Sequence, residues 1–296
     1  MHIDRLDVRL LRLPLAHFFE TSFGRSYDRT FLLIRLEGEG HVGWGECVAE
    51  AHPYYSSETT ETTWHIITSF LAARVVGHDF AHPREVFPAL ARVRGHNMAK
   101  AAVEMAAWDL YARGQGQPLS AVLGGTRDRI VSGVSIGIQD SLDQLVAKVE
   151  KELAAGYRRI KIKIKPGWDL NAVEAVRARF PDIQLMVDAN AAYSVRDGAH
   201  LAKLDAYKLM MIEQPLEYDD IRDHADHLPR LGVERRWTLG GIEHAQPAGR
   251  ACTDVDQPAS APQLVRHHLD RPRDRFRLRA NRLRDLRVLG IHQSNN

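Results

Sequence analysis

Three charged residues that recur every 25 positions constrain the fold of this chain more than any other feature. Lys163, Asp188 and Glu213 each stand at the end of a short segment with the composition of a β-strand. An interval of this length accommodates one strand, one helix and their loops, so the sequence predicts successive βα units. In a (β/α) barrel the carboxyl ends of the strands meet at one mouth, where the active site lies. The spacing therefore predicts a parallel barrel sheet with these charges at a common mouth.

The barrel pattern occupies residues 126–228. Apolar strand-like segments alternate there with amphipathic helical segments, and consecutive strands joined by helices pair in parallel. We predict an α/β barrel that is incomplete after its fourth readable strand. Its strands are expected over residues 131–138, 159–165, 184–188 and 209–213, and its helices over 141–155, 169–180 and 195–204.

Residues 1–125 follow a different pattern, which predicts a separate α+β domain. Alternating apolar and polar residues indicate half-buried strands, and Gly38-Glu39-Gly40 is typical of a hairpin turn. Apolar residues at helical spacing follow. We expect strands over residues 3–13, 30–37 and 41–47, and helices over 57–75, 83–93 and 97–112.

Composition places the chain among ordinary globular proteins. Its 296 residues suggest one large or two domains, and no apolar run reaches the 18 residues of a membrane-spanning helix. The first residues lack the pattern of a signal peptide. Cys47 and Cys252 form no paired motif and suggest reduced thiols. We therefore expect a cytoplasmic protein with no membrane partner.

Lysines alternate with isoleucines through residues 159–165. Side chains on a strand alternate faces, so Lys161, Lys163 and Lys165 share one face. Taken alone, the pattern also fits an exposed edge strand with solvated lysines. In a barrel the lysines would point inward, where burial and a second nearby cation lower an amine's pKa toward the range of a general base.

Carboxylates on the next two strand ends favour the barrel interpretation. Asp188 and Glu213 would converge beside Lys163, and paired carboxylates suit a hard divalent cation such as Mg²⁺ or Mn²⁺. Each acid taken separately also fits a helix cap or an ion pair. Asn190 lies at the same mouth, either orienting Asp188 or capping a helix.

Several motifs resemble the enolase superfamily, in the subgroup of o-succinylbenzoate synthases and N-acylamino-acid racemases. The resemblance covers roughly residues 1–228. It rests on Lys161-Ile162-Lys163 with Pro166-Gly167-Trp168-Asp169, on Val187-Asp188-Ala189-Asn190, on Ile212-Glu213-Gln214-Pro215, and on the segments at residues 20–24, 53–55, 95–100, 108–110 and 123–125.

This resemblance implies a capping domain over a modified TIM-type barrel and a set of residue roles. Lys163 would be the acid/base, Lys161 its electrostatic neighbour, and Asp188 and Glu213 two of three Mg²⁺ ligands. The implied chemistry is metal-assisted removal of the α-proton of a small carboxylate substrate. A synthase of menaquinone biosynthesis would then expel water, whereas a racemase would reprotonate the other face.

The capping segments would supply substrate specificity. By resemblance, residues 21–24 and 53–55 lie over the barrel mouth, where Phe23 and Tyr54 either line an apolar pocket or belong to the core. Ser135, on the first barrel strand, and Asn190 are further candidate substrate contacts. The oligomeric state is left open, and a homo-oligomer is one expectation.

The chain departs from the family pattern after residue 228. Gly240-Gly241 stands where the family carries its third acidic ligand, and Glu243 is the nearest carboxylate that would substitute for it. From Pro229 onward the chain has 13 Arg against 7 Asp and Glu, and no lysine. One hypothesis is that residues 229–296 are an out-of-frame translation, which would make the chain a truncated and inactive family member. An Arg-rich arm that binds nucleic acid is the rival, although it lacks interleaved aromatic residues.

Overall fold

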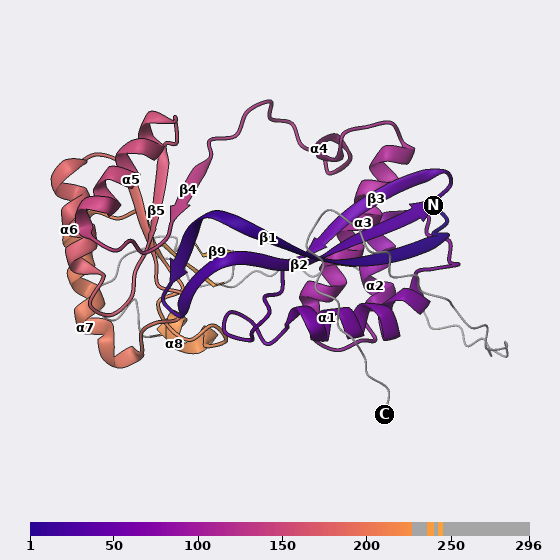
Figure 1. Ribbon diagram of the computed structural model, residues 1–296, viewed down its shortest axis with the longest axis horizontal. Helices are drawn as coiled ribbons and strands as arrows, with labels where there is room; N and C mark the ends of the chain where they lie inside the picture. Colours follow the sequence, from indigo (N-terminus) through magenta and orange to yellow (C-terminus); the bar gives the residue numbers. More distant parts are fainter. Residues whose placement is uncertain (227–235, 240–241, 245–296) are drawn as a thin grey trace.

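The computed structural model describes residues 1–226, 236–239 and 242–244. They form two units, each with its own sheet and buried core (Figure 1). One sheet has three antiparallel strands in the order β1-β2-β3, and the other has six strands in the order β4 to β9. Within these residues no helix is long and apolar enough to cross a membrane.

A long hairpin connects the two units. Strands β1 (Arg5–Thr21) and β2 (Gly24–Gly38) run well past the predicted limits, and β3 (His41–Cys47) completes the sheet. The register of β1 on β2 shifts between Pro14 and Phe19. Beyond that shift the strands leave the first core, and Figure 1 shows the arm reaching across to the second sheet. Regular alternation of apolar and polar residues does not mark this part of the hairpin, because it has no continuous buried face.

The helices of the first unit pack on one face of the small sheet. They are α1 (Thr60–Ile66), which continues through a π-turn (Ile67–Leu71) and a 3₁₀ turn (Ala72–Arg74), a 3₁₀ turn (Pro83–Glu85), α2 (Val86–Leu90), α3 (Asn97–Gly114) and α4 (Leu119–Val122). Helix α3 lies so close to β3 that a Cβ atom on Gly43 or Gly45 would overlap backbone of Ala106 or Ala102. Small residues therefore form most of the buried face of α3, whereas Met105 of the same helix is 46% exposed.

The second unit is the beginning of a (β/α) barrel. Strands β4 (Gly133–Ile136), β5 (Arg159–Lys163), β6 (Gln184–Asp188) and β7 (Met211–Glu213) are parallel neighbours. Figure 1 shows the intervening helices along one side of the sheet. These are α5 (Leu142–Ala154), α6 (Leu170–Arg179), α7 (Gly198–Leu201) between 3₁₀ turns (Val195–Asp197 and Ala202–Tyr207), and α8 (Ile221–Asp226). The helix expected over 195–204 is thus three short pieces.

Two further strands follow in the described backbone. Strand β8 (Arg236–Leu239) is parallel to β7, and β9 (Ile242–His244) returns antiparallel to β8. The prediction of an out-of-frame tail falls on residues 229–296, most of which lie outside the described residues.

The two faces of β5 divide as its sequence predicts. Ile160, Ile162 and Ile164 are fully buried and pack with residues of α6 such as Val173 and Val176. The alternate residues, Lys161 and Lys163, lie on the opposite face and reach the strand ends where the candidate site is built. Burial of the isoleucines therefore fixes the direction of the lysines.

Candidate active site

Backbone register brings the three recurring residues into one row. Lys163 pairs with Asp188 across β5 and β6, and Asp188 pairs with Glu213 across β6 and β7. Parallel strands of equal spacing end at the same edge, which explains why a 25-residue interval places these side chains together. Ser135 of β4 pairs with Lys161 of β5 and is exposed.

Lys163 is held by two oxygen acceptors in a nearly dry environment. Its Nζ donates to Asp188 Oδ2 at 2.6 Å and to Asn190 Oδ1 at 2.7 Å. Asp188 is 1% exposed and Lys163 is 7% exposed. Burial lowers the pKa of Lys163, although the charge of Asp188 opposes that effect. A lysine with a lowered pKa is suited to act as a general base.

Lys161 bridges the two carboxylates of the row. Its Nζ lies 2.9 Å from Glu213 Oε2 and 3.1 Å from Asp188 Oδ2. Burial lowers the pKa of Lys161, but the hydrogen bond to Glu213 and the charges of both acids outweigh it, so the pKa is raised. The two lysines thus have opposite shifts, and Lys161 remains the fixed positive charge.

Asn190 connects the site to the tip of the hairpin. Its backbone N–H donates to Asp188 Oδ1 at 3.0 Å, and its carbonyl accepts from Ser22 Oγ at 3.1 Å. Asn190, Ala191 and Gln214 all have positive φ values of 46°, 61° and 44°. Left-handed conformations at non-glycine residues store strain and gather at functional sites. The mouth of the sheet is therefore the place where this backbone departs from regular geometry.

Aromatic residues from the first unit lie near the row of charges. The rings of Phe23 and Tyr55 are 6.0 Å apart. Partial burial raises the pKa of Tyr55, and the negative charges of Asp188 and Glu213 raise it further. Tyr54, the residue singled out from sequence, is 68% exposed and its ring lies against His52. Sequence reasoning missed Tyr55, because the adjacent tyrosines look alike until the loop direction is known.

The acids of the row fit a divalent cation. Among the residues that the structure describes, no three His, Cys, Asp or Glu side chains form a metal cluster, and Asp188 and Glu213 are the two acids of the row. The ammonium of Lys161 between them shows that this position favours positive charge. Mg²⁺ accepts one or two carboxylates and keeps water or substrate oxygens for the rest. Glu243 lies on β9 opposite Thr238, which pairs with Glu213, and its side chain is outside the described part of the chain.

Comparison with known proteins assigns the family. Residues 6–124 match the mandelate racemase / muconate lactonizing enzyme N-terminal domain, and residues 144–234 match the enolase C-terminal domain-like family. A chloromuconate cycloisomerase of Pseudomonas putida is 30% identical and is matched over 90% of this chain and 70% of its own length. The chain belongs to the enolase superfamily. Because that match covers 90% of the chain, it includes part of residues 229–296.

Other relatives are more similar in sequence than the cycloisomerase, but the match covers a smaller share of each chain. An o-succinylbenzoate synthase of Geobacillus kaustophilus is 47% identical, over 78% of this chain and 62% of its own length. An N-succinylamino acid racemase of Thermus thermophilus is 49% identical, over 76% and 61%. A crystal structure of an enolase-superfamily member from Enterococcus faecalis V583 has a TM-score of 0.72 and 42% identity, covering 80% of this chain and 64% of that chain. The chain thus spans about three fifths of the length of the relatives it matches.

Proposed function

We propose that this site removes the proton α to the carboxylate of a small substrate, as an o-succinylbenzoate synthase of menaquinone biosynthesis or as an N-acylamino-acid racemase. The observation that carries the proposal is the buried contact of Lys163 with Asp188, in one row with Glu213. Relatives of both names match at similar identity, so similarity alone favours neither reaction.

The mechanism follows from the different environments of the site residues. Asp188 and Glu213 would hold Mg²⁺ or Mn²⁺, which would stabilise the negative charge that develops on the substrate carboxylate as its α-proton leaves. Lys163 takes the α-proton at Nζ, because burial lowers its pKa. Lys161 keeps its proton and provides positive charge beside the carboxylates. Asn190 holds the Lys163 amine in place.

Dehydration needs one acid/base lysine, whereas racemisation needs a base on each face of the substrate. Within the described ranges the lysines bonded to the acids of the row, Lys161 and Lys163, both come from β5. These two lysines supply the single base that dehydration needs. Racemase activity would require a second base from elsewhere in the protein.

Exchange of the substrate α-proton in deuterated water tests the chemistry directly. NMR of a succinylated amino acid or a synthase substrate, with Mg²⁺ present, is expected to show exchange. Lys163→Met should reduce the rate by roughly 10²–10⁴-fold, the usual contribution of a general base. The control is Lys148→Met, which removes a lysine of α5 that pairs with Glu152 within its own helix. Undiminished exchange in Lys163→Met would exclude the assigned role.

The competing proposal is a catalytically inactive family member. A Mg²⁺-dependent rise in Tm that disappears in Asp188→Asn and in Glu213→Gln would support a working metal site. If the wild-type chain shows neither that rise nor proton exchange, the inactive alternative holds. The mass of the natural protein and the sequence of its gene then test whether residues 229–296 belong to the native reading frame.

A further inference from the structure

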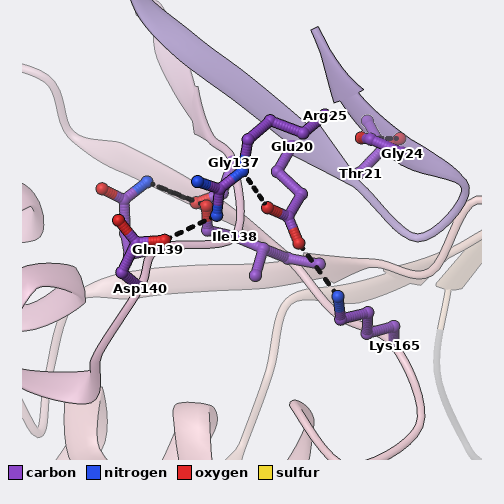
Figure 2. Close-up of polar contacts among 9 residues, drawn as sticks. All are labelled: Glu20, Thr21, Gly24, Arg25, Gly137, Ile138, Gln139, Asp140 and Lys165. Carbon is purple, nitrogen blue, oxygen red and sulfur yellow. Dashed lines mark hydrogen bonds and ion pairs between the residues drawn. The ribbon is translucent and has the colours of Figure 1, made fainter.

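Four charged residues fasten the tip of the β1–β2 hairpin to the barrel sheet. Glu20 Oε1 accepts from Lys165 Nζ at 2.9 Å, and Glu20 Oε2 accepts from Arg25 Nε at 2.5 Å. Arg25 also donates to Asp140 Oδ1 at 2.6 Å (Figure 2). The charges alternate through this cluster, which we call the tip latch. Its members come from three places: Glu20 and Arg25 from the hairpin, Asp140 from the loop after β4 and Lys165 from the segment just after β5.

Backbone contacts with residues 137 and 138 also hold Glu20 in place. The N–H of Ile138 donates to the carbonyl of Glu20 at 2.9 Å. A Cβ atom on Gly137 would lie 2.9 Å from both the nitrogen and the oxygen of Glu20, closer than real side chains approach. Figure 2 shows the carboxylate of Glu20 between the groups of Arg25 and Lys165. The side chain of Glu20 is 12% exposed, so its ion pair with Lys165 is neither fully buried nor freely solvated.

The tip latch is connected through Ser22 to Asn190, a residue that holds the acid/base Lys163. Ser22, two positions after Glu20, donates from Oγ to the carbonyl of Asn190. Asn190 in turn accepts from Lys163 through Oδ1 and donates to Asp188 through its N–H. A shift of the hairpin tip would therefore move a hydrogen-bond partner of Lys163, although Glu20 itself touches neither Lys163 nor Asn190 in the contacts described.

We propose that Glu20 is a positioning residue that sets the orientation of Lys163 through Ser22 and Asn190. This inference rests on the proposed function of the same site. The tip latch holds the hairpin tip in one position over the ends of β4 and β5. Ser22 then holds the backbone carbonyl of Asn190, and the side chain of Asn190 holds the Lys163 amine. Lys165 contributes as the anchor of the tip on β5, two residues beyond Lys163.

The kinetic test uses Glu20→Gln, Ser22→Ala and the double variant. Glu20→Gln keeps the shape of the side chain and removes its charge. Each single variant is expected to lower kcat by roughly 10- to 100-fold with KM nearly unchanged, because small misplacements of a catalytic group cost up to about 10²-fold. Since both act through one route, the double variant should be no slower than the slower single variant. Multiplied effects, or a rise in KM without loss of kcat, would overturn the proposal.

Hydrogen exchange provides a second readout that needs no activity. Backbone amides of residues 21–28 and 190–193 should exchange faster in Glu20→Gln than in the wild type, while those of α5 and α6 remain unchanged. The matched control is Glu150→Gln, which removes an exposed partner of Arg179 at 2.8 Å. Faster exchange of the tip without any change at residues 190–193 would show a structural latch only and would contradict the proposal. If the wild type lacks turnover while Glu20→Gln still exchanges faster at both segments, the proposed reaction fails and the positioning route stands.

Discussion

Replacing Asp188 by asparagine tests the electrostatic balance of the site. Asp188 is 1% exposed and accepts from two ammonium groups, Lys163 at 2.6 Å and Lys161 at 3.1 Å. Asp188→Asn preserves the shape but leaves Lys163 with Asn190 as its remaining acceptor, while Lys161 keeps Glu213. The buried ammonium of Lys163 would then have no carboxylate in contact, while Lys161, which is 24% exposed, would keep Glu213.

The expected loss of stability in Asp188→Asn follows from the burial of the Asp188–Lys163 ion pair. Removing one partner of a buried ion pair costs about 3–5 kcal/mol, because the other charge stays desolvated. For a folded region of this size each 1 kcal/mol shifts Tm by roughly 2–4 °C, so a fall of about 6–20 °C is expected at pH 7 without metal. Glu150→Gln removes the partner of Arg179 in a pair that is 2.8 Å apart and more than half exposed, and it should cost less than about 1 kcal/mol.

The pH dependence of the same variant provides an independent check. Burial already lowers the pKa of Lys163, and loss of the Asp188 charge lowers it further. The penalty is full below that lowered folded-state pKa and shrinks as pH rises through it, because a neutral amine needs no counterion. Urea unfolding from pH 7 to pH 10 measures the difference in free energy between variant and wild type. A difference below 1 kcal/mol at pH 7, or one that grows with pH, would refute this account.

Two further predictions concern packing and acid stability. Gly45→Ala should lower the free energy of unfolding by about 1–3 kcal/mol or more, because its Cβ would overlap the backbone of Ala102, whereas Gly114→Ala, with only His41 within 4 Å, should leave urea unfolding nearly unchanged. Burial raises the pKa of Glu20, but hydrogen bonds from Lys165 and Arg25 outweigh it and lower the pKa below 4.5. The charge of Glu20 therefore stabilises the fold fully above about pH 4.5 and less as pH falls through its folded-state pKa, so the stability difference between wild type and Glu20→Gln should shrink between pH 5 and pH 3.

Local sequence spacing was enough to place the main row of the site. The 25-residue interval specifies strand ends, and parallel register then pairs Lys163 with Asp188 and Asp188 with Glu213. The alternation of lysine with isoleucine in β5 specifies which face is buried, because only the isoleucines fit against α6. Such features depend on periodicity within single βα units, so they can be read without knowing the rest of the fold.

Contacts between the two units could not be read in the same way. The pairing of Glu20 with Lys165 joins residues 145 positions apart, and no local pattern marks either as a partner. The predicted strands end at residue 13 and resume at residue 30, whereas the structure continues both strands through a partly exposed outer hairpin whose register shifts between Pro14 and Phe19. The choice between Tyr54 and Tyr55 likewise depends on how an exposed loop turns. Each of these features is decided by packing between units.

Lys161 presents the final test, because its ammonium occupies the position between the acids that a metal would prefer. With Asp188 and Glu213 opposed by Lys161 and Lys163, the row is nearly neutral, so a cation must compete with an amine. A unit charge about 4 Å away opposes another by roughly 1–4 kcal/mol in a partly solvated site. Lys161→Met should therefore bind Mg²⁺ at least about fivefold more tightly by calorimetry, even though it loses a charge that assists catalysis. Weaker Mg²⁺ binding in this variant would mean that Lys161 organises the two acids for the metal, and that the bridge described here supports the cation site rather than competing with it.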